Sequence, residues 1–200
     1  MGHIFNAESV ELQNDKMKLN LKGKRALVTG GSAGIGLAIK QALEKEGVKV
    51  NSWSRREGID LRHIIPEMPD VDFLINNVGG LGSLDMDSWD SQLHINYITM
   101  VRTTLEFLRG RKKPGRVITI SSIYGKEKGH SPGFTAAKAA QIAYMKTLSG
   151  KYERITFNTI CPGHIDTGKP FPDKPKIIGK PEDVANIVTF LCSDLAKHIN

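Results

Sequence analysis

The chain has 200 residues and a formal net charge of +7, with 40% hydrophobic and 24% charged residues. This balance is that of an ordinary globular protein, and the length fits one domain. The basic residues are scattered and only 6% of residues are aromatic, which argues against a nucleic-acid-binding surface. No apolar run approaches the roughly 20 residues that span a bilayer. Cys161 and Cys192 form neither a disulfide framework nor a metal-ligand pattern, so we expect a cytoplasmic protein with no metal site and no membrane contact.

Residues 1–20 are polar and mixed in charge, and we expect an arm there, ahead of a single domain over residues 21–200. Short apolar runs then alternate with helical stripes. The predicted strands cover 25–29, 48–53, 71–75, 116–120 and 155–160, and the predicted helices cover 35–45, 89–108, 134–148 and 181–192. Apolar, β-branched strands that alternate with helices predict an α/β fold with a doubly wound parallel sheet, the Rossmann fold.

A glycine-rich segment, Thr29–Gly36 (TGGSAGIG), lies between the first predicted strand and the first predicted helix. This is the context in which such a turn binds phosphates. Gly30 suits the tight turn, Gly34 leaves room for a pyrophosphate, and Gly36 lets the helix pack close to the sheet. The helix N-terminus adds free N–H groups and a partial positive charge. The alternative is an ordinary strand-to-helix turn.

Further motifs follow this turn in a fixed order. They are NNVG at 76–79, Asn96, ISS at 120–122, Lys138 in FTAAK, CPGHIDT at 161–167 and PEDV at 181–184. Together with the TGxxxGxG spacing, they resemble the short-chain dehydrogenase/reductase family over about Lys22 to Leu195. The resemblance implies an oxidoreductase that interconverts a small-molecule carbonyl and an alcohol by hydride transfer with NAD(P).

The resemblance also implies roles for site residues. Ser122 would polarise the substrate carbonyl, Lys138 would hold the nicotinamide ribose and assist the proton donor, and Asn96 would anchor a proton-relaying water. The family's proton donor is a tyrosine four residues before the lysine, one helical turn away. In this chain that position is Phe134, which cannot exchange a proton.

Four explanations of Phe134 stay open. The residue is a substitution introduced to trap a complex, or it is natural and Tyr124 or His130 donates the proton instead. Alternatively, the chain binds NADP without turnover, as a sensor or partner subunit, or its reaction uses a different proton route or no redox step. The presence of Ser122, Lys138 and Asn96 together favours the first two.

The end of the second predicted strand bears on the choice of cofactor. An acidic residue there would repel a 2′-phosphate, whereas this chain has Ser54 followed by Arg55 and Arg56, so we expect NADP rather than NAD. By resemblance, Asp60 contacts the adenine with Leu61 beside the ring. The cofactor-binding residues implied are Gly30, Ser32, Ala33, Gly34, Ile35, Gly36, Ser54, Arg55, Arg56, Asp60, Leu61, Asn76, Val78, Gly79, Lys138, Pro162, Gly163, Ile165 and Thr167.

The chain is short on its adenine side. Between Ser54 and Asp60 there is no room for the usual helix and full third strand, and the segment to Val71 is also abbreviated, which resembles dihydropteridine-reductase-like members. The substrate loop, Gly168 to Lys180, is basic, which favours either an anionic substrate or a solvated loop. The resemblance implies a final C-terminal strand, which we do not expect in the sequence up to Asn200. By resemblance, the two long central helices predict a homodimer or homotetramer.

Overall fold

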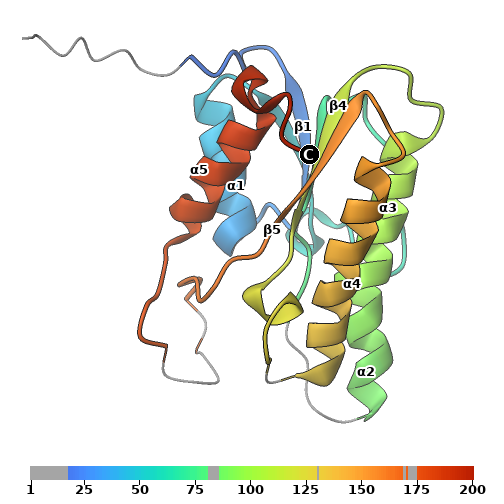
Figure 1. Ribbon diagram of the computed structural model, residues 1–200, viewed down its shortest axis with the longest axis vertical. Coiled ribbons are helices and arrows are strands. Elements are labelled where there is room, and N and C mark those ends of the chain that lie inside the picture. Colours follow the sequence, from blue (N-terminus) through green and yellow to red (C-terminus); the bar gives the residue numbers. More distant parts are fainter. Residues whose placement is uncertain (1–17, 81–85, 130, 169, 171–174) are drawn as a thin grey trace, which may run out of the picture.

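The computed structural model describes residues 18–80, 86–129, 131–168, 170 and 175–200. One parallel sheet lies between two layers of helices (Figure 1), which confirms the predicted doubly wound α/β fold. The arm expected at residues 1–20 lies outside the described residues except for its last three. Among the described residues, none of the helices is both long enough and apolar enough to cross a membrane.

The five strands follow the order β2-β1-β3-β4-β5 in the sheet. Their bounds are β1 Arg25–Thr29, β2 Lys49–Trp53, β3 Phe73–Asn76, β4 Gly115–Ile120 and β5 Ile155–Ile160. The helices are α1 Gly34–Lys45, α2 Met86–Leu93, α3 Thr99–Leu108, α4 Pro132–Ser149 and α5 Pro181–Cys192. Each predicted strand and helix is found within a few residues of its expected bounds.

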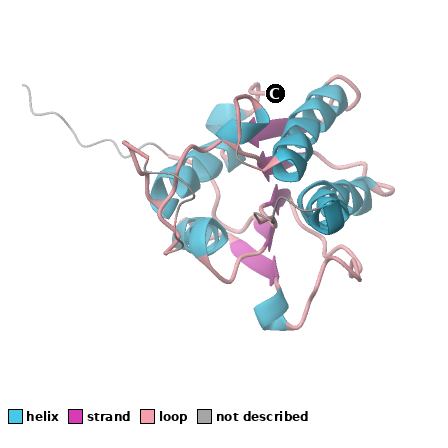
Figure 2. Cartoon of the chain, turned by 90° about the horizontal axis from the view of Figure 1, so that it is seen from below, coloured by secondary structure: helices cyan, strands magenta, loops and turns pink. Residues whose placement is uncertain are grey.

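The helices divide between the two faces of the sheet. Helices α1 and α5 cover one face, and α2, α3 and α4 cover the other (Figures 1 and 2). The central strand β1 serves both layers, because successive side chains of a strand point to opposite faces. Val28 packs in the core under α1 and α5, and Leu27 packs in the core under α3 and α4. Both side chains are fully buried, so β1 contributes to the core on both faces of the sheet.

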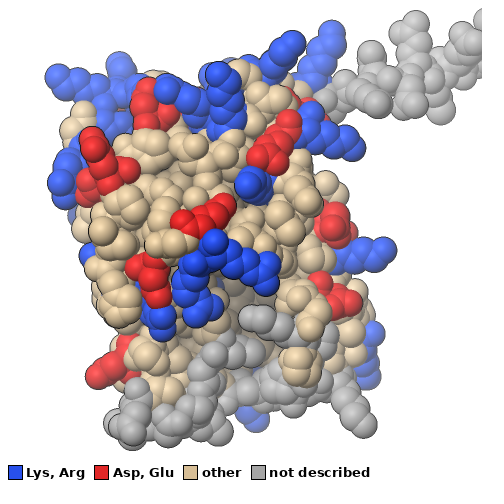
Figure 3. All heavy atoms as spheres, turned by 180° about the vertical axis from the view of Figure 1, so that it is seen from behind, with Lys and Arg blue, Asp and Glu red and all other residues tan. Residues whose placement is uncertain are grey.

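The segment between β2 and β3 is as short as expected. It contains one 3-10 turn, Arg55–Glu57, and no α-helix. Strand β2 is therefore an edge of the sheet. Seen from behind, this side of the molecule carries Lys and Arg side chains interspersed with Asp and Glu (Figure 3). The surface charge is mixed on this face rather than gathered into one basic stripe.

The predicted helix over 89–108 is wrong in one respect, because it is not one continuous α-helix. Helix α2 already begins at Met86, and a π-helical turn, His94–Ile98, separates it from α3. Two side chains bond backbone carbonyls there: Asn96 Nδ2 donates to the Gln92 carbonyl at 2.9 Å, and Thr99 Oγ1 donates to the His94 carbonyl at 3.0 Å. Such bonds compete with the regular helix ladder.

Candidate active site

The glycine-rich turn between β1 and α1 adopts a conformation that requires glycine. Gly30 and Gly34 have φ angles of +71° and +51°, in the left-handed region. A Cβ on Gly36 would lie 2.2 Å from the Gly30 carbonyl oxygen, so only glycine lets α1 approach the turn. Helix α1 begins after Ala33 with no side-chain cap. Its first N–H groups are thus available to an anion such as a phosphate.

The turn is fastened to the loop that follows β3. Thr29 Oγ1 accepts hydrogen bonds from the N–H groups of Asn77 and Val78, at 2.9 and 3.2 Å. Asn77 Nδ2 donates to the carbonyls of Thr29 and Gly30, at 3.0 and 3.3 Å. Strands β1 and β3 are neighbours from which the chain departs in opposite directions, and ligands of doubly wound sheets bind at such a switch point. Sequence reasoning missed the role of Asn77; its only signal was the doubled asparagine.

The space between the glycine-rich turn and the loop after β3 is the crevice of the site. Asn76 points away from this crevice. Its Oδ1 accepts a hydrogen bond from Thr103 Oγ1 at 2.6 Å, and its Nδ2 donates to Thr104 Oγ1 at 2.9 Å. Its side chain is buried against α3. The structure therefore places it as a support for the loop after β3, whereas Val78 and Gly79 continue that loop along the crevice.

The loop after β5 closes the other side of the turn. Thr167 Cγ2 lies 3.2 Å from the position of a Cβ on Gly34, so the two segments are in close contact. A hollow of about 260 Å³ opens beside them; it is lined by Gly34, Leu37, Ala38, Gln41, Asp166, Thr167, Pro181 and Glu182. Ile165 forms a bridge with Gly179, and Gly163 has no neighbour within 4 Å of its Cβ position. Turn and loop together form a cradle at the N-terminus of α1.

A carboxylate lies at the end of β2, where sequence reasoning found only serine and arginine. Glu57 Oε2 accepts hydrogen bonds from Ser54 Oγ at 2.5 Å and from Ser52 Oγ at 2.8 Å. Arg56 donates to the Ser32 carbonyl at 3.1 Å, which joins this turn to the glycine-rich turn. Ser54 is buried, whereas Arg55, Arg56 and Glu57 are exposed. The edge of the crevice therefore holds both signs of charge.

The two residues expected at the adenine lie in different environments. Asp60 forms an ion pair with Arg62, which also donates its backbone N–H to the same carboxylate at 3.1 Å. The Arg62 guanidinium holds the pKa of Asp60 well below its usual range. Leu61 is only 3% exposed and packs in the core with Trp53. It therefore offers an adenine ring little surface.

Lys138 is the most unusual group at the carboxyl edge of the sheet. It is only 4% exposed, and its Nζ donates to the Ile120 carbonyl at 2.9 Å. Burial lowers the pKa of its ammonium from 10.5 to about 8. The Phe134 ring, one helical turn earlier and 9% exposed, has its centroid 5.4 Å from the same nitrogen. Phe134 supplies an apolar face to Lys138 and no acid.

Asn96 and Lys138 meet at Gly79. A Cβ on Gly79 would lie 2.6 Å from Asn96 Oδ1 and 3.4 Å from Lys138 Nζ. Asn96 is fully buried; its Oδ1 accepts the Gly80 N–H, and its Nδ2 donates to the carbonyls of Gly80 and Gln92, each at 2.9 Å. Both N–H hydrogens of this amide are thus used inside the protein. Asn96 holds the loop after β3 in place beside Lys138.

Ser122 follows β4 by two residues and caps a 3-10 turn, Ile123–Gly125. Its Oγ accepts the Tyr124 N–H at 3.2 Å, and a hydroxyl that accepts in this way can still donate its own hydrogen to a substrate oxygen. A Cβ on Gly125 would lie 2.8 Å from the Lys138 carbonyl carbon, so this turn packs directly on α4. The turn thereby brings Ser122 to the same edge as Lys138. His130, the other proton donor considered, lies outside the described residues, as do parts of the substrate loop.

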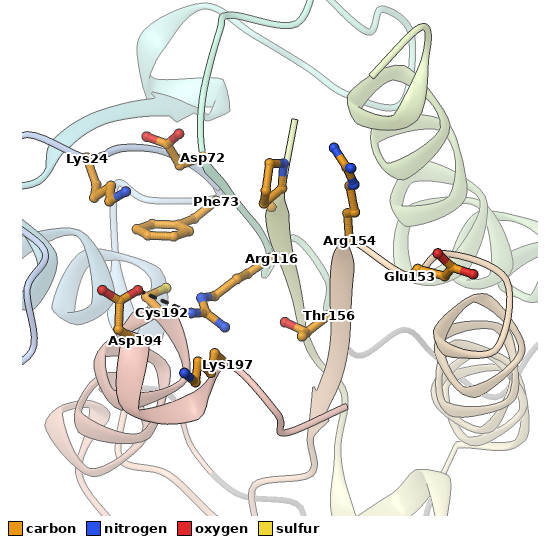
Figure 4. A pocket seen from close by; sticks show the side chains of 12 residues that line it. Lys24, Asp72, Phe73, Arg116, Glu153, Arg154, Thr156, Cys192, Asp194 and Lys197 are labelled. Carbon is orange, nitrogen blue, oxygen red and sulfur yellow. Dashed lines mark ion pairs between the residues drawn. The ribbon is translucent and has the colours of Figure 1, made fainter. Parts of the chain in front are cut away.

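A second hollow, of about 210 Å³, opens at the opposite edge of the sheet (Figure 4). Arg116 lies across it, donating to the Ala196 carbonyl at 3.3 Å and facing Asp194 at 3.8 Å. Its side chain is 11% exposed. These contacts fasten the turn after α5 to β4. The hollow is therefore separate from the candidate active site.

Comparisons with known proteins agree with this geometry. A family model described as short chain dehydrogenase matches residues 60–170. The chain is 30% identical to the 3-oxoacyl-[acyl-carrier-protein] reductase FabG of Vibrio cholerae, over 90% of this chain and 94% of that protein. It is 31% identical to the acetoacetyl-CoA reductase of Shinella zoogloeoides, over 87% and 92%.

Solved structures agree as well. A short-chain dehydrogenase from Burkholderia cenocepacia, in complex with NADP, superposes with a TM-score of 0.76 and 26% identity over 90% of this chain and 94% of that one. A short-chain dehydrogenase/reductase from Serratia marcescens gives a TM-score of 0.77 and 26% identity over the same shares. The chain belongs to the short-chain dehydrogenase/reductase family and is an oxidoreductase of that family.

Proposed function

We propose that the chain interconverts a carbonyl and an alcohol on a small molecule, with NADP(H) as its preferred cofactor. The observation that carries this proposal is the buried Lys138, held beside Gly79 and Asn96 on the edge that also bears Ser122. In this arrangement the Ser122 hydroxyl donates a hydrogen bond to the substrate oxygen and polarises the carbonyl. Lys138 lies where its ammonium can bind a ribose and lower the cost of negative charge nearby.

The cradle fits a dinucleotide. The glycine-rich turn, including Ser32, Ala33 and Ile35, would hold the pyrophosphate, and Pro162–Thr167 would face the nicotinamide. Val78 and Gly79 would line the crevice between them, and Asp60 would face the adenine. A bound nicotinamide nucleotide supplies or accepts the hydride. The chain's own residues orient the substrate oxygen toward Ser122 and keep that edge partly shielded from water.

The preference for NADP rests on Arg55 and Arg56, which are exposed beside the glycine-rich turn. Guanidinium groups suit a 2′-phosphate. Glu57 opposes them, although Ser52 and Ser54 already hydrogen-bond its carboxylate. We expect Arg56→Ala to weaken NADPH binding about tenfold with little change for NADH. Glu57→Gln should strengthen NADPH binding, and calorimetry with both nucleotides measures the two effects.

Activity in this chain should be impaired, because Phe134 occupies the position of the family's proton donor. Complete loss of a positioned general acid costs about 10²–10⁴ in rate, and a substitute donor would recover part of that loss. The buried Phe134 also supports a second candidate function, in which the chain binds NADP without turnover as a sensor or partner subunit. That function predicts tight nucleotide binding and no reaction.

A comparison of the chain with Phe134→Tyr tests the proposal. Acetoacetyl-CoA, ethyl acetoacetate and a panel of simple ketones serve as substrates, with NADPH oxidation as the readout. We expect the tyrosine variant to turn over at least one of them, and to do so faster than the unaltered chain. If neither protein reacts while calorimetry shows NADPH binding, the silent function is favoured. If no nicotinamide nucleotide binds, both functions are refuted.

We propose a homodimer or homotetramer built on α3 and α4. Ile98, the last residue of the π-helical turn, and Leu105 on α3 are seven residues apart and are 41% and 53% exposed. Large apolar side chains gathered on one face suit an interface. Light scattering should give a mass above one chain, and Leu105→Glu should reduce it to that of the monomer.

A further inference from the structure

A tyrosine–histidine pair bridges two loops at the carboxyl edge of the sheet. The Tyr124 hydroxyl and His164 Nε2 lie 2.9 Å apart, at hydrogen-bond distance. The two rings meet edge to face, with centroids 5.9 Å apart and an interplanar angle of 84°. Both side chains are half-buried. The carbonyl chemistry proposed above uses neither residue.

The sheet holds this pair in place. Strands β4 and β5 run in parallel, and the Ser121 N–H donates to the Ile160 carbonyl at 2.8 Å just beyond their ladder. The Ile123 N–H then donates to the Pro162 carbonyl at 2.9 Å, which joins the two following loops. Tyr124 and His164 come from these two loops, so their meeting is fixed by backbone contacts on both sides.

The pair lies next to the groups that would handle the substrate. Tyr124 donates its N–H to Ser122 Oγ, so the tyrosine and the carbonyl-polarising hydroxyl belong to one rigid turn. That turn packs on α4 at Lys138, the residue that follows Phe134 by one helical turn. His164 lies within the Pro162–Thr167 segment, which contacts the glycine-rich turn through Thr167.

We propose that Tyr124 is the proton donor of this chain, in place of the phenol that Phe134 lacks, and that His164 positions and recharges it. The inference rests on the carbonyl–alcohol reaction proposed above. In the Nε2–H form, the His164 imidazole donates to the phenol oxygen, which directs the phenol O–H toward a second acceptor. That acceptor is the carbonyl oxygen polarised by Ser122.

The proton steps balance. As the carbonyl carbon gains hydride from the reduced nucleotide, its oxygen forms an O–H bond with the proton of Tyr124, and the phenol O–H bond breaks. The phenolate then takes the Nε2 proton of His164 in its imidazolium form, which leaves a neutral imidazole with its hydrogen on Nδ1, and this imidazole regains a proton from solvent. Oxidation of an alcohol runs the same transfers in reverse. Tyr124 is therefore a catalytic residue, and His164 is a positioning residue.

The test uses the full chain and four variants: Tyr124→Phe, Phe134→Tyr, the double variant Tyr124→Phe/Phe134→Tyr, and Tyr144→Phe as a control from α4. Acetoacetyl-CoA and NADPH are the probes, and NADPH affinity is measured separately by calorimetry. We expect Tyr124→Phe to lower kcat about 10²–10³-fold with NADPH affinity within about twofold, since the phenol is a general acid. The double variant should regain activity, and the control should keep it.

For His164, we expect His164→Ala to lower kcat with little change in KM, and added imidazole to restore part of the rate. A purely structural histidine would give no rescue by imidazole. In the chain without nucleotide, nitrogen NMR should show the His164 Nε2 resonance shifting in Tyr124→Phe and not in Tyr144→Phe.

Three results would overturn the inference. If the chain turns over acetoacetyl-CoA and Tyr124→Phe retains its kcat, the inference fails while the proposed function stands. An unchanged His164 resonance in Tyr124→Phe also refutes the pair. If neither the chain nor Phe134→Tyr turns over any carbonyl, the proposed function fails. The inference then fails too, because it rests on that function.

Discussion

The buried Lys138 ammonium makes a quantitative prediction about stability. Burial lowers its pKa from 10.5 to about 8. At 1.4 kcal/mol per unit, this shift means that the charged form costs the folded state about 3 kcal/mol at pH 7. Because the folded pKa is the lower one, the unfolded chain binds more protons between pH 8 and 10.5. Stability from this group therefore rises with pH across that window, and about 2 kcal/mol should be regained by pH 9.5.

Lys138→Met tests this reasoning, because methionine keeps the length of the side chain and removes the charge. Urea denaturation of both proteins from pH 7 to 9.5 gives the difference in unfolding free energy at each pH, in which other titrating groups cancel. We expect the variant to be the more stable protein at pH 7 and its advantage to shrink by about 2 kcal/mol at pH 9.5. Lys146→Met, at an exposed position of α4, serves as the control. Parallel curves for Lys138→Met and the unaltered chain would refute the lowered pKa.

Three further predictions concern stability and cofactor binding. Gly36→Ala places a Cβ against backbone atoms and should destabilise the fold by about 1–3 kcal/mol. In the control Gly150→Ala the nearest atom is 3.9 Å from the new Cβ, so the effect should be much smaller. Thermal denaturation compares the two variants. Asn96→Ala leaves buried backbone groups without partners, so it should lower the free energy of unfolding by about 2 kcal/mol or more. It should also weaken NADPH binding in calorimetry. Unchanged stability would contradict the role of this amide. Arg116→Met loses the bond to the Ala196 carbonyl and should destabilise by about 1–2 kcal/mol in urea, with NADPH affinity unchanged.

Periodicity in the sequence was enough to predict the sheet and its covering helices. Strands such as 25–29 and 155–160 are apolar and bounded by turn residues, and helices such as 181–192 begin at a proline. These signals are local, which is why they could be read one segment at a time. The short segment after β2 was predictable for the same reason, since too few residues are present to build a helix there.

Features that depend on contacts across the fold were not predictable. Asn76 and Asn77 are neighbours in sequence, yet one faces α3 and the other faces the glycine-rich turn, because side chains alternate along a strand. Glu57 reaches back to Ser52 only because the chain makes a 3-10 turn at that point. The π-helical turn at Asn96 depends on side-chain bonds that no periodicity encodes.

The same distinction bears on the meaning of Phe134. A chain that kept this fold for structural reasons alone would gain stability by replacing the buried Lys138 with an apolar residue of similar size. The lysine is instead held by the Ile120 carbonyl beside Gly79, at a cost of about 3 kcal/mol when charged. Buried groups with a shifted pKa cluster at binding and catalytic sites. The geometry around Lys138 thus favours a working nucleotide site. Because Phe134 lacks a phenol, the Tyr124–His164 pair is the candidate source of the proton.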